Sequence, residues 1–192
     1  MSITAVVLAG GKGRRMGGVD KGMVEFLGKP MVAHVLERLR SQSPDILINA
    51  NREIERYAAF GYPVIQDDIP DYAGPLAGLH KAMTSTEAAY ILTVPCDAPL
   101  LPRNLLAKLM DGMMAHDADI AIAKTGMQAH PVISLSRRAL LPSLTRYLQE
   151  GGRKVDIWQQ GHEVVEVQFS QHPLAFSNIN TSDELLTLEQ AA

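Results

Sequence analysis

Glycine and basic residues are concentrated in one short stretch near the start of the chain. The stretch LAGGKGRRMGGVDK, residues 8–21, contains five glycines and a single acid, Asp20. Its basic residues are Lys12, Arg14, Arg15 and Lys21. So many glycines reduce stability unless the backbone approaches another group closely or adopts positive φ. Open backbone amides and cations together form a cradle for phosphate groups. We therefore interpret the stretch as a phosphate-binding loop rather than a solvated basic loop.

Two better-known phosphate motifs do not fit this loop. A dinucleotide-binding GxGxxG fingerprint that used Gly11 and Gly13 would need a glycine in place of Met16. A P-loop needs Ser or Thr after its Gly-Lys pair, but Gly13 and Pro30 follow the two such pairs near the start of this chain. The sequence therefore argues against a nicotinamide dehydrogenase and against P-loop kinase or GTPase chemistry.

A carboxylate, Asp97, follows the fourth apolar run in the segment VPCDAPLL. In an open parallel sheet, ligands bind outside the C-terminal ends of the strands, so Asp97 is expected near the glycine loop. A carboxylate held in a proline-stiffened segment is a suitable oxygen ligand for magnesium, which would bridge phosphate oxygens. The alternative is that Asp97 is a turn or helix-capping residue before Pro99. Together with the glycine loop, the sequence favours the metal site.

Cysteine and histidine add little further chemistry. Cys96 is the single cysteine, which excludes an internal disulfide and a cysteine-based zinc site. No histidine is near it in sequence, so we expect Cys96 to pack as a small apolar residue. The six histidines lack the spacing of a zinc site. For His130, which precedes Pro131, a structural use is favoured over a place in a cleft.

Short apolar runs alternate with longer stretches of helical period, which is typical of βαβ units around a mainly parallel sheet. We expect strands over residues 3–9, 45–50, 63–66, 89–94, 118–123, 129–135 and 164–169. We expect helices after Pro30, Pro75 and Pro102, over residues 137–150, and from Thr181 onward. The predicted fold class is α/β: a three-layer, doubly wound, Rossmann-like architecture with a mainly parallel sheet. Since 192 residues show no linker or repeat, we expect a single domain over residues 1–192.

Composition and charge limit the classes of function. With 46% hydrophobic and 20% charged residues, the chain has the composition of a soluble globular protein. The net charge of -3 argues against a general affinity for nucleic acid or for an anionic membrane. The N-terminal residues lack the basic start of a secretory signal, and no apolar run reaches the ~20 residues of a membrane-spanning helix. We therefore expect a cytoplasmic protein without nucleic-acid or membrane partners.

Five motifs, in this order along nearly the whole chain, resemble those of the molybdenum cofactor guanylyltransferases. They are LAGGKGRRMGGVDKG from residue 8, NANR at 49–52, GPLAGL at 74–79, PCD at 95–97 and NINT at 178–181. The first motif alone indicates only the wider nucleotidyltransferase group, whereas RRMGG, NANR and NINT are similar to the guanylyltransferases in particular. The resemblance implies a nucleotidyltransferase fold and an enzyme that transfers GMP from GTP to the phosphate of molybdenum-molybdopterin, releasing pyrophosphate. It also implies partner proteins that deliver or receive the cofactor.

The motif match and the glycine loop together assign nucleotide contacts to Leu8, Ala9, Gly10, Gly11, Lys21, Asn49, Asp67 and Asp97. Because Asp68 adjoins Asp67, the motif match at this position can shift by one residue. The alternative to a nucleotide contact here is a plain polar turn. Asn178 and Asn180 alternate along an extended segment, where they would either contact the pterin or satisfy buried loop backbone. We expect a nucleotide-binding part over about residues 1–100 and a pterin-facing part over about residues 101–192.

The expected mechanism depends on charge cancellation and alignment, because the acceptor phosphate is already an anion at neutral pH. We expect Lys21 and a magnesium ion on Asp97 to hold the α-phosphate, and Arg15 with the loop amides to stabilise the departing pyrophosphate. Asp67 would accept from N1 and N2 of guanine or from a ribose hydroxyl. Two alternatives remain: a cytidylyltransferase or other nucleotidyltransferase acting on a phosphorylated acceptor, and a GTP-binding module without chemistry.

Overall fold

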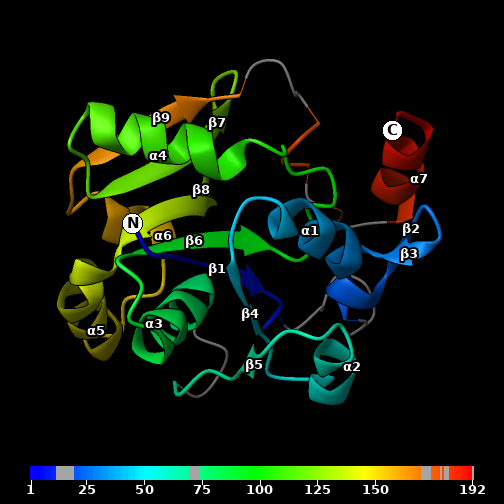
Figure 1. The fold of residues 1–192 in the computed structure, drawn as a ribbon, viewed down its shortest axis with the longest axis horizontal. Coiled ribbons are helices and arrows are strands. Elements are labelled where there is room, and N and C mark those ends of the chain that lie inside the picture. The colour runs from blue at the N-terminus through cyan, green and yellow to red at the C-terminus, as the bar shows by residue number, and fades with distance from the viewer. Residues whose placement is uncertain (12–19, 70–73, 170–173, 178, 180–181, 192) are drawn as a thin grey trace.

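A twisted sheet forms the centre of the molecule. The computed structural model describes residues 1–11, 20–69, 74–169, 174–177, 179 and 182–191. In this part of the chain the central sheet has seven strands, in the order β5-β4-β1-β6-β8-β7-β9 (Figure 1). Their bounds are β1 Ile3–Leu8, β4 Asp45–Asn49, β5 Val64–Ile65, β6 Tyr90–Pro95, β7 Ile120–Thr125, β8 Gln128–Arg137 and β9 Val164–Gln168. All neighbouring pairs are parallel except those that include β8, which is antiparallel to both β6 and β7.

Helices cover both faces of this sheet, which gives the three layers expected from the sequence. In Figure 1, α1 and α4 lie over one face, and α3 and α5 lie over the other. The helices are α1 Met31–Arg40, α2 Ile54–Ala58, α3 Pro75–Ser85, α4 Leu105–Ala115, α5 Leu141–Gln149, α6 Val155–Gln159 and α7 Ser182–Ala191. Two 3₁₀ helices, η2 Lys21–Met23 and η3 Arg138–Leu140, and a short hairpin, β2 Glu25–Phe26 and β3 Lys29–Pro30, complete the described elements. The predicted α/β, doubly wound, mainly parallel fold is confirmed.

The central strand β1 shows why this sequence forms a buried sheet. Ala5, Val6 and Val7 are all fully buried, which is typical of a strand covered on both faces. Because successive side chains point to opposite faces, Ala5 and Val7 join the core under α1 and α4, while Val6 joins the core under α3 and α5. Each face therefore has its own apolar cluster, and the strand between them is held rigidly.

The C-terminal half differs in detail from the expectation. The strand expected over residues 129–135 is longer, Gln128–Arg137, and the helix expected over residues 137–150 begins only after it, as η3 followed by α5. The last helix, α7, returns to the hairpin of β2 and β3, where Leu188 packs with Phe26 and Met31 (Figure 1). Within the described ranges, no helix has both the length and the hydrophobicity that crossing a membrane requires.

Candidate active site

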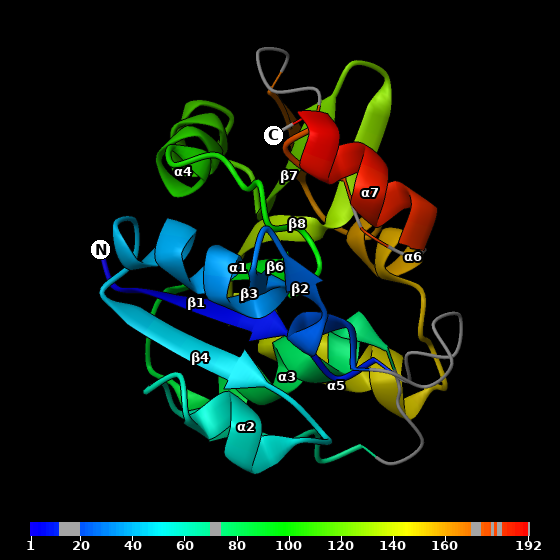
Figure 2. The ribbon, with the colours of Figure 1, turned by 90° about the vertical axis from the view of Figure 1, so that its right-hand side faces the viewer.

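The candidate site lies where three parallel strands end. Leu8, the last residue of β1, is in register with Asn49 of β4 on one side and with Pro95 of β6 on the other. The backbone continues this pairing, since the Ala9 N–H donates to the Asn49 carbonyl over 2.8 Å and the Cys96 N–H donates to the Leu8 carbonyl over 3.1 Å. The arrows of β1 and β4 end at the same edge in Figure 2. The expected proximity of the glycine loop to the segment after β6 is therefore confirmed.

Lys21 and Asp97 meet at this edge. The Lys21 Nζ lies 3.3 Å from the Asp97 Oδ2, and the two residues come from η2 and from the turn after β6. Asp97 is only 8% exposed, and this burial raises the pKa of its carboxyl, while the Lys21 ammonium acts in the opposite direction. A buried carboxylate is stabilised by cations, so the position suits an ion as well as the lysine.

Asp97 fits a metal that arrives with a nucleotide. No group of three or more metal-binding side chains of His, Cys, Asp or Glu occurs among the residues that the structure describes. Magnesium is commonly held by one or two carboxylates, with substrate phosphates and water as the other ligands. The buried carboxylate of Asp97, beside Lys21 and the start of the glycine loop, has the chemistry of such a ligand.

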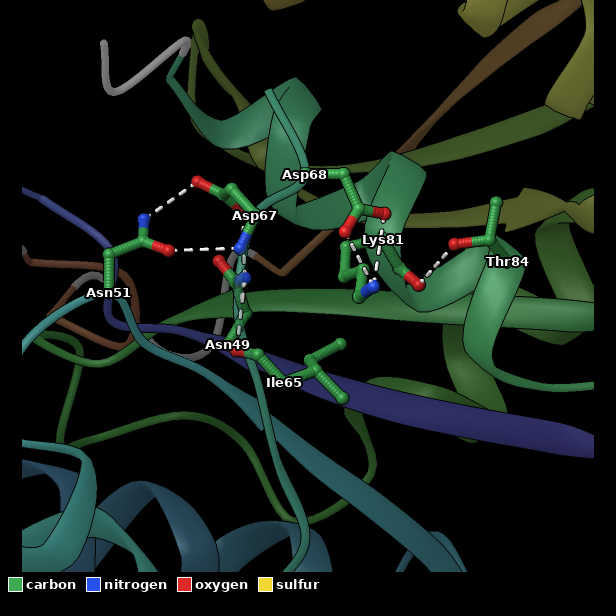
Figure 3. A network of polar contacts seen from close by, with 7 residues as sticks. All are labelled: Asn49, Asn51, Ile65, Asp67, Asp68, Lys81 and Thr84. Atoms are coloured by element: carbon green, nitrogen blue, oxygen red, sulfur yellow. Dashed lines mark hydrogen bonds and ion pairs between the residues drawn. The ribbon is translucent and has the colours of Figure 1, made fainter. Parts of the chain in front are cut away.

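A second polar cluster joins the ends of β4 and β5 (Figure 3). The two oxygens of Asp67 accept from the Asn49 Nδ2 over 2.8 Å and from the Asn51 Nδ2 over 2.7 Å. In return, the Asp67 N–H donates to the Asn51 Oδ1 over 2.9 Å. The orientation of the Asp67 carboxylate is thus fixed before any ligand binds.

Two glycines make room for this cluster. A Cβ on Gly10 would lie 2.9 Å from the Asn51 Nδ2, and a Cβ on Gly78 would lie 2.4 Å from the Asn49 Oδ1. Since real Cβ atoms essentially never approach so closely, a side chain at either position would displace an amide. The cluster of Asn49, Asn51 and Asp67 therefore depends on these glycines of the LAGG and GPLAGL motifs.

Asp67 and Asp68 have different contacts. Asp68 forms an exposed ion pair with the Lys81 Nζ at 2.8 Å, whereas Asp67 accepts from the two amides at the strand ends (Figure 3). On the other side of the cluster, the Arg52 Nη2 donates to the Gly11 carbonyl over 3.3 Å. The NANR segment thus contacts both Asp67 and the start of the glycine loop.

Cys96 and His130 have the structural surroundings that the sequence predicted. Cys96 is buried, and burial raises the pKa of its thiol well above the ordinary value, so it packs as an apolar residue. The His130 Nε2 lies 2.7 Å from the Thr125 Oγ1, and its ring packs on Phe176 with centroids 5.0 Å apart. Burial lowers the pKa of this imidazole, which keeps it neutral.

Three predicted site residues, Arg15, Asn178 and Asn180, lie outside the described residues. The contacts that Asn51, Arg52 and Asp20 make were not predicted from the sequence. Asn51 carried a usable signal, because Asn49 and Asn51 are two residues apart in a segment that leaves a strand, and such residues share a face. The contacts of Arg52 and Asp20 depend on distant segments and left no signal in the sequence.

Comparison with known proteins supplies a family. The model of the family described as "MobA-like NTP transferase domain" matches residues 5–164. The chain is 46% identical to a protein of Shewanella pealeana named molybdenum cofactor guanylyltransferase, over 98% of this chain and 94% of that one. It is 47% identical to the protein of the same name from Shewanella loihica, over 98% and 96% of the two chains.

Solved structures agree with the fold. The crystal structure of molybdopterin-guanine dinucleotide biosynthesis protein A from Archaeoglobus fulgidus matches with a TM-score of 0.80 and 23% identity, over 98% of this chain and 97% of that one. At this identity the match concerns the architecture alone. The architecture of this chain is thus that of a known fold.

Proposed function

This chain belongs to the MobA-like NTP transferases and, within them, to the molybdenum cofactor guanylyltransferases, and on that premise we propose how its residues perform the transfer. The reaction joins GMP from GTP to the phosphate of molybdenum-molybdopterin, releases pyrophosphate and forms the molybdopterin guanine dinucleotide cofactor. Its substrates are therefore GTP and the molybdopterin. The proposal concerns which side chains contact the phosphates, the guanosine, the pterin and a magnesium ion.

The observation that carries the proposal is the contact of Lys21 with Asp97. The ammonium lies 3.3 Å from a buried carboxylate, at the edge where β1 continues into the glycine loop, and this pairing of charges supports a phosphate site there. Lys21 would contact the α-phosphate, and the backbone amides of Gly10 and Gly11 would donate to phosphate oxygens. Asp97 would hold magnesium, which when bound would neutralise part of the phosphate charge.

The protein's contribution to the chemistry is alignment and charge cancellation. The attacking phosphate is an anion at neutral pH, so no side chain has to remove a proton from it. Lys21 reduces the repulsion between the two anions at the α-phosphorus, and Arg15 would take up charge on the departing pyrophosphate. Burial around Asp97 strengthens these electrostatic contacts, because solvent screens them less.

The nucleoside would bind beside the β4 end. Leu8, Ala9, Asn49 and Asp67 would contact it, and the two amides that fix Asp67 leave each of its oxygens a second lone pair for a ligand donor. Such a donor would be N1 and N2 of guanine or a ribose hydroxyl. The preformed carboxylate reduces the entropy lost when the ligand binds.

The pterin would bind on the side of the C-terminal segment. The Ile179 N–H donates to the Asp97 carbonyl over 3.3 Å, so this residue of the NINT motif contacts the turn that contains Asp97. We assign its amides, Asn178 and Asn180, to the pterin on this ground and on the motif match. The nucleotide-binding part then covers about residues 1–100 and the pterin-facing part about residues 101–192 of a single domain.

A transfer assay tests the proposal. The purified chain would be mixed with molybdenum-molybdopterin and either GTP or CTP, and pyrophosphate release would be measured with magnesium present, after chelation, and after its return. We expect release with GTP, little with CTP, and a loss on chelation that added magnesium reverses. Tight GTP binding without release would indicate a binding module, and preference for CTP would indicate a cytidylyltransferase. Lys21→Ala should abolish most turnover, while Lys29→Ala, an exposed lysine paired with Glu37, serves as the control.

A further inference from the structure

A buried tyrosine on α2 contacts the residue that precedes Lys21. Tyr57 is fully buried, and its hydroxyl donates to the Asp20 Oδ1. From this contact we infer that Tyr57 is a positioning residue, which sets the place of the Lys21 ammonium through Asp20. The inference rests on the proposed contact of Lys21 with the phosphates of GTP. Tyr57 itself is not proposed to touch the substrate.

Asp20 controls the turn that carries Lys21. Its Oδ1 also accepts from the Gly22 N–H over 3.1 Å, which makes Asp20 the N-cap of η2. Its carbonyl accepts from the Met23 N–H over 3.0 Å. A 3₁₀ helix of three residues has few internal hydrogen bonds, so its geometry depends strongly on the cap. Lys21 is the first residue of this helix, and any displacement of Asp20 moves it directly.

The Tyr57 hydroxyl is also packed against the backbone of η2. A Cβ on Gly22 would lie 2.4 Å from the Tyr57 Oη and 3.3 Å from the Cys96 Cβ. The residue next to Lys21 is therefore enclosed between α2 and the turn that contains Asp97. This enclosure fixes the spacing of the two elements that bring Lys21 and Asp97 together.

The polar character of Tyr57 is needed for Asp20 rather than for the core. Phenylalanine would fill nearly the same volume, but it would remove one of the two donors, Tyr57 Oη and the Gly22 N–H, that the described residues supply to the Asp20 Oδ1. The other oxygen, Oδ2, is buried and has no hydrogen-bond partner among the described residues. Burial raises the pKa of the Tyr57 phenol far above its ordinary value, so its hydroxyl remains a donor at all physiological pH values. Without that donor, the partly buried carboxylate would gain by turning toward water.

The position of α2 connects the two halves of the site. The helix begins at Ile54, two residues after the end of the NANR segment. In that segment, Asn51 donates to Asp67 and Arg52 donates to the Gly11 carbonyl. The NANR segment and the α2 helix that follows it therefore contact the nucleoside side through Asn51 and the phosphate side through Tyr57. This arrangement would keep the distance between the two binding regions constant.

The test is a comparison of GTP affinity in four proteins: the unmodified chain, Tyr57→Phe, Lys21→Ala, and the double variant. We expect Tyr57→Phe to weaken GTP binding about tenfold when Lys21 is present, which corresponds to about 1.4 kcal/mol. In the Lys21→Ala background the same change should weaken binding less than about twofold, because the residue through which Tyr57 acts is absent. Calorimetry gives the affinities, and thermal unfolding is recorded for each protein.

A matched control removes a different tyrosine hydroxyl. Tyr147 of α5 donates to the Lys154 carbonyl over 3.1 Å rather than to Asp20, and Tyr147→Phe should leave GTP affinity unchanged. Equal weakening by Tyr57→Phe in both backgrounds, or no weakening in either, would overturn the inference. If Tyr57→Phe does not fold, Asp20→Asn takes its place in the same comparison. A Lys21→Ala protein that binds GTP normally would instead overturn the proposed function of Lys21.

Discussion

Asp97→Asn should have opposite effects on turnover and on folding stability, because the buried carboxylate of Asp97 serves the first and costs the second. The substitution keeps the shape of the side chain and an oxygen that can accept from the Lys21 Nζ, 3.3 Å away in the unmodified protein, but it removes the negative charge. If Asp97 holds magnesium, turnover should fall roughly 100-fold, since losing one preorganised electrostatic contact to the transition state costs about 3 kcal/mol. Folding stability should change in the opposite direction.

The stability effect follows from the pKa of Asp97. Burial raises this pKa above the ordinary value of an aspartate carboxyl, by more than the Lys21 ammonium lowers it. The contribution of Asp97 to folding stability is therefore fully present at pH values below the pKa that its carboxyl has in the unfolded chain. This contribution is lost as the pH rises through the pKa that the carboxyl has in the folded protein. Each unit by which the pKa in the folded protein exceeds the pKa in the unfolded chain corresponds to about 1.4 kcal/mol of stability at neutral pH. Asparagine does not ionise, so Asp97→Asn should be at least as stable as the unmodified protein at pH 7.

The assay combines turnover with unfolding. Pyrophosphate release is measured over a series of magnesium concentrations, and urea unfolding is measured at pH 7 and again near the unfolded pKa, where the stability advantage of Asp97→Asn should vanish. Asp111→Asn, on the exposed side of α4, is the matched control and should alter neither quantity. Full magnesium-dependent turnover by Asp97→Asn would refute the metal assignment. A loss of several kcal/mol of stability at pH 7 would refute the account of its burial.

Three other substitutions test the remaining parts of the site. In Gly78→Ala, the new Cβ would lie 2.4 Å from the Asn49 Oδ1 and would displace this amide from Asp67, so we expect about tenfold weaker GTP binding by calorimetry. Gly161→Ala, whose Cβ would have ordinary contacts, is its control, and equal affinities in the two variants would contradict this reasoning. Asp67→Asn would set an NH₂ group against the NH₂ group of Asn49 or Asn51. The free energy of unfolding in urea and the free energy of GTP binding should therefore each become less favourable by about 1–3 kcal/mol. An unchanged GTP affinity would remove Asp67 from the site. Cys96→Ala should keep turnover within about twofold and lower stability by roughly 1 kcal/mol, whereas a tenfold loss of turnover would indicate chemistry at the thiol.

The layered fold and the meeting of Asp97 with the glycine loop were predictable from the sequence for a physical reason. Strands buried on both faces appear as continuous apolar runs, and the C-terminal ends of parallel strands share one edge. The residues that follow β1 and β6 were thereby expected to be neighbours before any coordinates were considered. The reversed direction of β8 was not predictable, because an apolar run has the same period in either direction.

The supporting contacts of the site were beyond sequence reasoning. The Asp20 contact joins residues 37 positions apart, and it depends on where the five-residue helix α2 packs. A helix so short has little intrinsic stability, so its place is set by tertiary packing rather than by local pattern. The assignments of Arg15, Asn178 and Asn180 remain predictions from the motif match.

A crystal structure with bound GTP and a divalent metal tests the central claim most directly. Soaking with manganese in place of magnesium would locate the metal by its anomalous scattering. The account predicts the phosphates over Gly10 and Gly11, the Lys21 Nζ within hydrogen-bonding distance of a phosphate oxygen, and the metal bound to an oxygen of Asp97. A nucleotide bound away from the ends of β1 and β6, or a metal with no contact to Asp97, would contradict it.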